Sequence, residues 1–98
     1  MRIRLVAAAL AVSLLSPPVM AQDKVGVAAC DEYLENYYAC LPKMTPAEQQ
    51  DATARLPRWR AQWKELAADA KNRDDLAGIC KSEADAMRRG YTAIGCKF

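Results

Sequence analysis

The sequence predicts an all-α fold, a small three-helix bundle held together by two disulfides. Three observations lead to this prediction: apolar residues recur at helical spacing in three separate segments, four cysteines follow residue 29, and the first 21 residues have the pattern of an export signal. Removing 21 of the 98 residues leaves 77, which is enough for a single disulfide-stabilised domain over residues 22–98.

Residues 1–21 are predicted to be a cleaved signal peptide. Arg2 and Arg4 give a positive start, an apolar run follows, and Val19 and Ala21 place small residues where a cleavage site requires them. The run is too short to cross a bilayer, which argues against the alternative of an N-terminal membrane anchor, and no second run of membrane length follows. We therefore expect a protein with no transmembrane segment after cleavage, periplasmic in a Gram-negative bacterium or secreted.

Export determines how the cysteines are interpreted. In an oxidising compartment, four cysteines in a chain of this size predict two disulfides. The shortest gap between two of them is the nine residues that separate Cys30 and Cys40, so no C-x2-C pair suggests a zinc site or a thiol oxidoreductase. We expect neither a metal nor a cofactor.

The first helix is expected over about residues 28–41. One of its faces carries four apolar residues at spacings of four, three and four, namely Cys30, Leu34, Tyr37 and Leu41. Acidic residues in its first turns favour the positive end of the helix dipole. Pro42 ends the helix, because proline disfavours helical backbone at the preceding residue and lacks an N–H group.

The second helix is expected to begin at the sequence Thr45-Pro46-Ala47-Glu48 and to continue to about Asn72. Threonine is a capping residue, proline suits the first helical position, and glutamate three residues after the cap completes a capping box. The apolar stripe of this helix is Ala52, Leu56, Trp59, Trp63, Leu66 and Ala70. Because the stripe keeps its phase across Pro57, one helix kinked at Pro57 is favoured over two helices with Pro57 opening the second.

The third helix is expected from about Asp75 to Tyr91, after a polar turn that offers a cap. Its apolar residues are Leu76, Cys80, Ala84, Met87, Tyr91 and Ile94. Gly90 and Gly95 weaken its end, and a disulfide at Cys96 would hold the last residues in place.

Helix geometry favours one of the three disulfide connectivities. Cys30 and Cys40 lie about 15 Å apart along one helix, whereas a disulfide requires Cα atoms within about 7 Å, so these two do not pair with each other. In an up-down-up bundle the outer helices run parallel, which favours Cys30–Cys80 and Cys40–Cys96. The nested alternative, Cys30–Cys96 with Cys40–Cys80, requires antiparallel outer helices.

Charge and composition argue against several functions. Arg2 and Arg4 account for two of the 14 Lys and Arg residues, so the mature chain has 12 cations, 12 Asp and Glu residues and a net charge of zero, which argues against nucleic-acid binding. The chain has no histidine, the usual general base. Adjacent acids at 31–32 and 74–75 lie at expected helix starts, where capping explains them. We expect no enzymatic activity and no catalytic residues.

Three tyrosines of the first helix are candidate interface residues. Tyr33, Tyr37 and Tyr38 cover more than one helix face, so at least one is expected to be partly exposed. Exposed tyrosine clusters often mark protein interfaces. The alternative is that all three pack in the bundle with their hydroxyl groups reaching water.

The second helix carries an aromatic and basic segment over 55–64. Trp59 stands among Arg55, Arg58 and Arg60, and such a set could bind a partner protein, a glycan or an anionic surface. Trp59 and Trp63 are in phase with the leucines of the stripe, however, and this favours a core position for both indoles, with the cations on the solvated side.

The mature chain resembles a group of small exported helical proteins with four cysteines from Gram-negative bacteria. The resemblance rests on Cys30-Asp31-Glu32-Tyr33-Leu34, Cys40-Leu41-Pro42, the helix with Trp63, Cys80, and Gly95-Cys96-Lys97-Phe98. It covers nearly all of the mature chain. It implies the scaffold and brings no activity with it.

Taken together, these observations favour a small exported, non-catalytic protein-interaction module, with an unidentified protein partner in the cell envelope. The alternative is a peripheral envelope binder that contacts anionic lipid or glycan through the helix over Arg55–Lys64. The oligomeric state is left open by the sequence.

Overall fold

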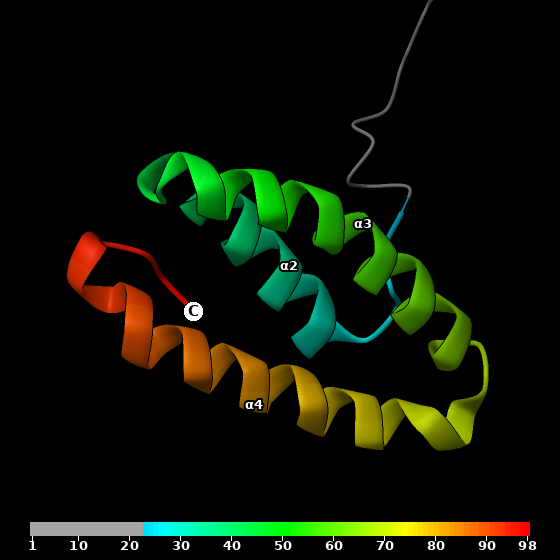
Figure 1. The fold of residues 1–98 in the computed structure, drawn as a ribbon. Coiled ribbons are helices and arrows are strands. Elements are labelled where there is room, and N and C mark those ends of the chain that lie inside the picture. The colour runs from blue at the N-terminus through cyan, green and yellow to red at the C-terminus, as the bar shows by residue number, and fades with distance from the viewer. Residues whose placement is uncertain (1–22) are drawn as a thin grey trace, which may run out of the picture.

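The computed structural model describes residues 23–98, which form three α-helices: α2 (Ala28–Cys40), α3 (Pro46–Ala67) and α4 (Arg73–Tyr91) (Figure 1). Three short 3₁₀ helices follow them in turn: η1 (Leu41–Lys43), η2 (Ala70–Asn72) and η3 (Thr92–Ile94). The predicted all-α class and the three helices are confirmed. The predicted signal peptide and its alternative, a membrane anchor, lie outside the described residues. Within residues 23–98, no helix has the length and apolar character needed to cross a membrane.

The start of α2 is fixed by Asp31, an acid that the sequence places in the first turn. Its carboxylate accepts hydrogen bonds from the backbone N–H groups of Val25 (2.7 Å) and Gly26 (3.2 Å). Gly26 has a φ of +91°, a value that glycine adopts without strain. These contacts fold the segment before α2 back onto the helix, and both Val25 and Val27 are buried there.

The start of α3 is the predicted capping box. The Thr45 side chain accepts a hydrogen bond from the Glu48 backbone N–H, and the Glu48 side chain accepts one from the Thr45 backbone N–H. The helix then runs without interruption through Pro57, which confirms a single helix rather than two. Pro57 is exposed, so its ring displaces no core side chain.

The predicted stripe of α3 is wrong at its end. The buried residues are Ala52, Leu56, Trp63 and Ala67, whereas Leu66 is 42% exposed. A heptad repeat drifts by about 20° per seven residues around a straight α-helix, so the core side moves from position 66 to position 67. The helix also ends at Ala67 rather than near residue 72, because the chain turns there through η2.

The turn between α3 and α4 is closed by side chains that bond the last carbonyl groups of α3. Asn72 donates to the Leu66 oxygen (3.2 Å), and Arg73 donates to the Ala67 oxygen (2.8 Å). These bonds satisfy helix-end carbonyls that have no partner inside the helix. The turn therefore makes α3 and α4 antiparallel neighbours.

Two disulfides join α2 to α4 and to the segment after it, with the favoured connectivity. Cys30 pairs with Cys80, and Cys40 pairs with Cys96, with Cα–Cα distances of 5.0 and 5.3 Å. The first bridge joins the N-terminal part of α2 to α4, and the second joins the C-terminal end of α2 to the residues after η3. The two outer helices are consequently parallel.

The unequal spacing of the cysteines is absorbed after α4. Cys80 and Cys96 are six residues further apart than Cys30 and Cys40. The chain leaves α4 at Tyr91, passes through η3 and reverses at Gly95, whose φ is +87°. This reversal returns Cys96 to the level of Cys40.

The core lies between the three helices, and α2 contributes more of it than either neighbour. The buried residues of the whole core are Val25, Val27, Cys30, Tyr33, Leu34, Tyr37, Cys40, Met44, Ala52, Leu56, Trp63, Ala67, Leu76, Cys80 and Cys96. All four cysteines belong to it. The disulfides are therefore part of the core and not additions to its surface.

Removing either bridge is expected to destabilise the fold strongly. The bridges span 50 and 56 residues, and closing a loop of that size stabilises a protein by roughly 4 kcal/mol in the chain-entropy model. The pair Cys30→Ala/Cys80→Ala and the pair Cys40→Ala/Cys96→Ala should each lower the free energy of unfolding by about 2–5 kcal/mol, measured by urea titration. The change Ser82→Ala, at an exposed position of α4, serves as the control. Unchanged unfolding midpoints in both cysteine pairs would contradict a structural role for the bridges.

Candidate functional site

A cluster of aromatic rings occupies the space between α2 and α3. Tyr33 lies 5.8 Å from Tyr37 and 6.0 Å from Trp63, measured between ring centroids, and Trp59 stacks on Trp63 at 5.9 Å. Phe98 completes the cluster, with its ring 5.9 Å from Tyr33 and 6.0 Å from Tyr37. Offset and edge-to-face pairs at these distances stabilise a core beyond the area that they bury.

Tyr33 and Tyr37, two of the candidate interface residues, lie in the core of the bundle. Their exposed fractions are 2% and 5%, because α3, α4 and Phe98 cover a wider arc of α2 than one apolar stripe. Burial raises the pKa of both hydroxyl groups above the ordinary value of 10, so both side chains stay neutral. Tyr38 is half-buried and is the one member of the predicted tyrosine cluster left on the surface.

The predicted aromatic and basic segment of α3 does not form one patch. Arg60 lies over the ring of Tyr38 (5.2 Å), and Lys64 pairs with Asp23 (3.1 Å), so both point toward α2 and the segment before it. Arg58 lies exposed on the outside of α3. Arg55 lies over Trp59 on another side of the helix. The helix thus distributes these cations around its circumference.

Arg55 is held in place by three neighbours. Its guanidinium lies 2.8 Å from the Asp51 carboxylate, donates to the Tyr37 hydroxyl at 3.4 Å and lies 5.1 Å above the Trp59 ring. Its Nε atom is buried and has no hydrogen-bond partner among the described residues. A planar guanidinium stacked on an indole ring is a stable arrangement for such a group.

Exposed and half-buried apolar side chains gather where α3 meets α4. We call this surface the α3/α4 edge and define it by five residues: Arg55, Trp59, Leu66, Ile79 and Met87. The first three share one side of α3, at intervals of four and seven. Ile79 and Met87 lie on α4, which runs beside α3 between the hydrogen bond of Arg73 to Ala67 at one end and that of Tyr91 to Glu48 at the other.

The large apolar side chains of the α3/α4 edge are accessible to solvent. Leu66 is 42% exposed and Ile79 is 50% exposed, while Trp59 and Met87 are half-buried. Leu66 belongs to the predicted core stripe of α3, and no sequence pattern singles out Ile79. Their exposure follows from the drift of the α3 stripe and from the position of Ile79 one residue before the buried Cys80.

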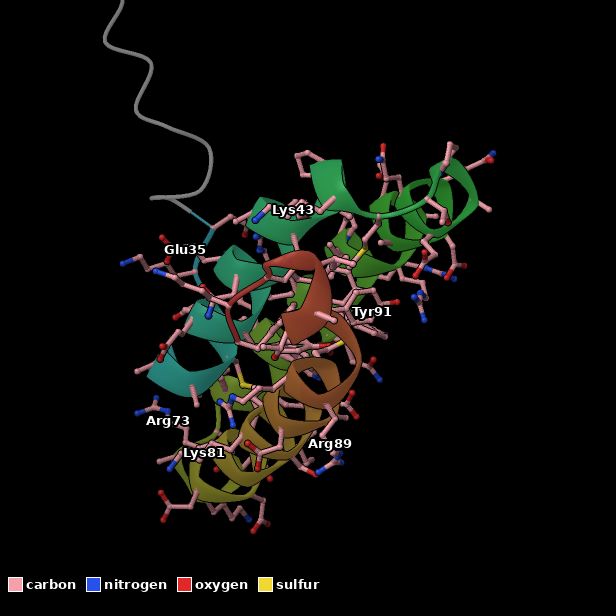
Figure 2. The ribbon with its side chains drawn as sticks, turned by 90° about the vertical axis from the view of Figure 1, so that its left-hand side faces the viewer. Glu35, Lys43, Arg73, Lys81, Arg89 and Tyr91 are labelled. Atoms are coloured by element: carbon pink, nitrogen blue, oxygen red, sulfur yellow. A yellow bond between two sulfur atoms is a disulfide. The ribbon has the colours of Figure 1, made fainter. Side chains whose placement is uncertain are left out.

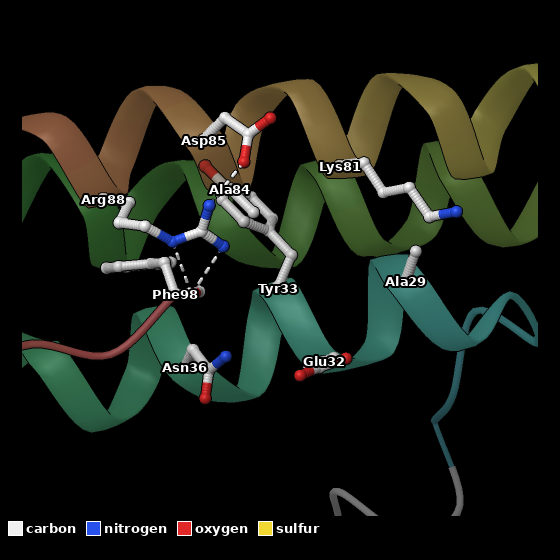
Figure 3. Close-up of a pocket in the computed structure, with 9 residues that line it drawn as sticks. All are labelled: Ala29, Glu32, Tyr33, Asn36, Lys81, Ala84, Asp85, Arg88 and Phe98. Carbon is white, nitrogen blue, oxygen red and sulfur yellow. Dashed lines mark hydrogen bonds and ion pairs between the residues drawn. The ribbon is translucent and has the colours of Figure 1, made fainter.

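A groove between α2 and α4 holds the residues after η3. Beyond Phe98 it opens into a pocket of about 170 Å³, with walls formed by Ala29, Glu32 and Asn36 of α2 and by Lys81, Ala84 and Arg88 of α4 (Figure 3). Tyr33 lies at its base. Nothing in the sequence analysis indicated this pocket, because its walls come from segments about fifty residues apart.

Charged side chains surround the bundle without forming a face of one sign. Glu35, Lys43, Arg73, Lys81 and Arg89 project from the surface at separate places (Figure 2). In residues 23–98, no group of three or more Cys, Asp or Glu side chains is arranged to hold a metal ion. The acids at 31–32 and 74–75 lie in the first turns of α2 and α4, and Asp31 accepts hydrogen bonds from the N–H groups of Val25 and Gly26 in the segment before α2.

Comparison with known proteins finds no matching family model, no matching curated protein and no matching solved structure.

A hydrogen bond between Tyr91 and Glu48 joins the C-terminal end of α4 to the capping box of α3. This bond, followed by those from Thr45, lowers the pKa of the Glu48 carboxyl below its ordinary value of 4.5. The same bond raises the pKa of Tyr91 above 10. A depressed carboxyl pKa contributes stability that is present above pH 4.5 and is lost as the pH falls through the folded-state pKa. The raised tyrosine pKa contributes stability that is present below pH 10 and is lost above it.

The change Glu48→Gln is therefore expected to reduce the acid sensitivity of the fold. Between pH 6 and pH 3, the urea midpoint of the wild-type protein should fall further than that of Glu48→Gln, because only the wild type protonates this carboxylate. Glu65→Gln, at an exposed position near the other end of α3, is the matched control. Equal losses in all three proteins would show that the Glu48–Tyr91 bond does not contribute.

Proposed function

We propose that the protein is a small exported, non-catalytic protein-interaction module of the bacterial cell envelope, and that it binds its partner through the α3/α4 edge. Two buried disulfides are typical of proteins that fold in an oxidising compartment. The expected signal peptide also predicts export to an oxidising compartment, the periplasm or the space outside the cell.

The observation that carries this proposal is the exposure of large apolar side chains on the α3/α4 edge. In the described residues the large hydrophobics above 40% exposure are Leu66, Ile79 and Ile94, and the first two belong to this edge. Trp59 and Met87, the other two apolar members of the edge, are half-buried. Exposed apolar side chains that gather on one surface favour association with another protein.

The composition of the edge also suits a protein partner. Tryptophan, methionine and arginine are enriched at interfaces, and a central aromatic residue surrounded by less critical contacts is the usual arrangement of a hot spot. Contacts with Asp51 and Trp59 already order the Arg55 side chain, so a partner that contacts it would lose little rotamer entropy on binding.

The alternative function, a peripheral envelope binder that contacts anionic lipid or glycan through the helix over Arg55–Lys64, has weaker support. Its cations point to different sides of α3, and Arg55 and Lys64 pair with Asp51 and Asp23. A membrane surface attracts cations that act together on one face, within a Debye length of the lipid headgroups.

Site-specific crosslinking tests the interaction module. Leu66→p-benzoylphenylalanine and Ile79→p-benzoylphenylalanine should each give a discrete crosslinked species in cells that export the protein, at least fivefold more than Ala61→p-benzoylphenylalanine on the exposed side of α3. Adding Leu66→Asp to the variant with the probe at position 79 should remove the species, because a buried unpaired charge opposes docking. Equal yields at all three positions, or a species that persists with Leu66→Asp, would refute the α3/α4 edge as the contact surface.

Vesicle binding separates the two functions. We expect sedimentation with phosphatidylglycerol vesicles to be no greater than with phosphatidylcholine vesicles at about 0.05 M salt, where exposed charges act over more than 10 Å. Arg58→Glu should not change the result. Selective binding to the anionic vesicles that disappears at about 0.5 M salt and in Arg58→Glu would favour the envelope binder instead.

A further inference from the structure

The groove between α2 and α4 already holds one stretch of extended chain. Residues 95–98 lie in it after the reversal at Gly95, and the disulfide from Cys96 to Cys40 anchors them. Lys43 donates a hydrogen bond to the Gly95 carbonyl oxygen at 2.7 Å. Arg88 donates two bonds to the Phe98 oxygen, at 3.1 and 2.8 Å. The groove thus binds main-chain oxygens with cations at both ends of this stretch.

The Phe98 side chain shows what the base of the groove accepts. Its ring packs on the rings of Tyr33 and Tyr37, both of which are buried. This part of the groove therefore combines an aromatic base with cationic donors to the backbone. These are the features with which proteins recognise an extended peptide that carries a large apolar side chain.

The other half of the groove shares Tyr33 and Arg88 with the filled half and forms the pocket beyond Phe98. Its base is formed by Tyr33 and by two half-buried alanines, Ala29 and Ala84, whose small side chains leave the pocket of about 170 Å³. At roughly 30 Å³ per water molecule, this volume holds about six waters, which is comparable to one large side chain. Phe98 lines one end of the pocket, so the empty half continues from the filled half (Figure 3).

The rim of the pocket offers opposite charges on its two walls. Glu32 lies on the α2 wall and Lys81 on the α4 wall; both are exposed, and they do not pair with each other. An extended peptide presents N–H groups and carbonyl oxygens along both of its edges. Glu32 can accept from the former and Lys81 can donate to the latter.

We propose that the empty half of the α2/α4 groove binds an extended peptide segment of a partner protein, with one large apolar side chain seated on Ala29, Tyr33 and Ala84. The site is separate from the α3/α4 edge, and its occupation does not depend on the function assigned to that edge.

Titration with a blocked peptide tests this site. The probe is acetyl-Gly-Ala-Phe-Ala-Gly-amide, added to the disulfide-intact, ¹⁵N-labelled protein. Amide shifts should concentrate at Ala29, Glu32, Ala84 and Asp85. The same peptide with alanine in place of phenylalanine should bind at least tenfold more weakly, because it leaves the pocket unfilled.

Two variants fill the pocket from opposite walls, and each has a matched control. Ala84→Phe and Ala29→Leu should each weaken peptide binding at least tenfold, while Ala86→Phe, at an exposed position of α4, should leave it within twofold. Thermal unfolding of each variant identifies any variant that does not fold. The peptide affinity of the variant that does fold then tests the proposal.

Three results would overturn the proposal. The first is the absence of saturable shifts at millimolar peptide. The second is a set of shifts centred on Leu66 and Ile79, which would place the peptide on the α3/α4 edge. The third is equally tight binding of free phenylalanine, which would identify an amino-acid site in place of a peptide site.

Discussion

The pairing of α2 with α4 through two buried disulfides is the constraint on which the rest of the structure depends. Bridges at both ends of α2 make it parallel to α4, so α3, which connects the two in the chain, must run antiparallel to both. That arrangement places α2 centrally and buries its tyrosines against the tryptophans of α3. A domain of this size has little core of its own, and cross-links of this kind commonly supply the stability that it lacks.

The second bridge also shapes the surface. It places Cys96 beside Cys40, and the reversal at Gly95 then directs Phe98 into the groove between α2 and α4. The same constraint therefore completes the aromatic cluster and leaves half of the groove open. The α3/α4 edge lies on another side of the bundle, where Leu66 and Ile79 stay exposed among residues 23–98. One small scaffold thus presents two different apolar surfaces.

Local chemistry explains what could be predicted from the sequence. The capping box and the helix end near Pro42 follow from backbone geometry. The rise of one helix excludes a Cys30–Cys40 bridge, and an up-down-up order of helices favours the observed pairing over the nested one. Burial was less predictable. Tyr33 and Tyr37 are covered partly by Phe98, which is more than sixty residues away in the sequence. Leu66 lies outside the core because a seven-residue repeat drifts around a straight helix. The groove depends entirely on such distant contacts, so no sequence pattern indicates it.

The central claim is that the disulfides hold the aromatic core together, and reduction of the wild-type protein tests it most directly. Near-ultraviolet circular dichroism reports the packing of the tyrosine and tryptophan rings, and far-ultraviolet dichroism reports helix content. Addition of a dithiol reductant without denaturant should abolish the near-ultraviolet signal and lower the helical signal as the four thiols become titratable. Four titratable thiols with both spectra unchanged would contradict the claim.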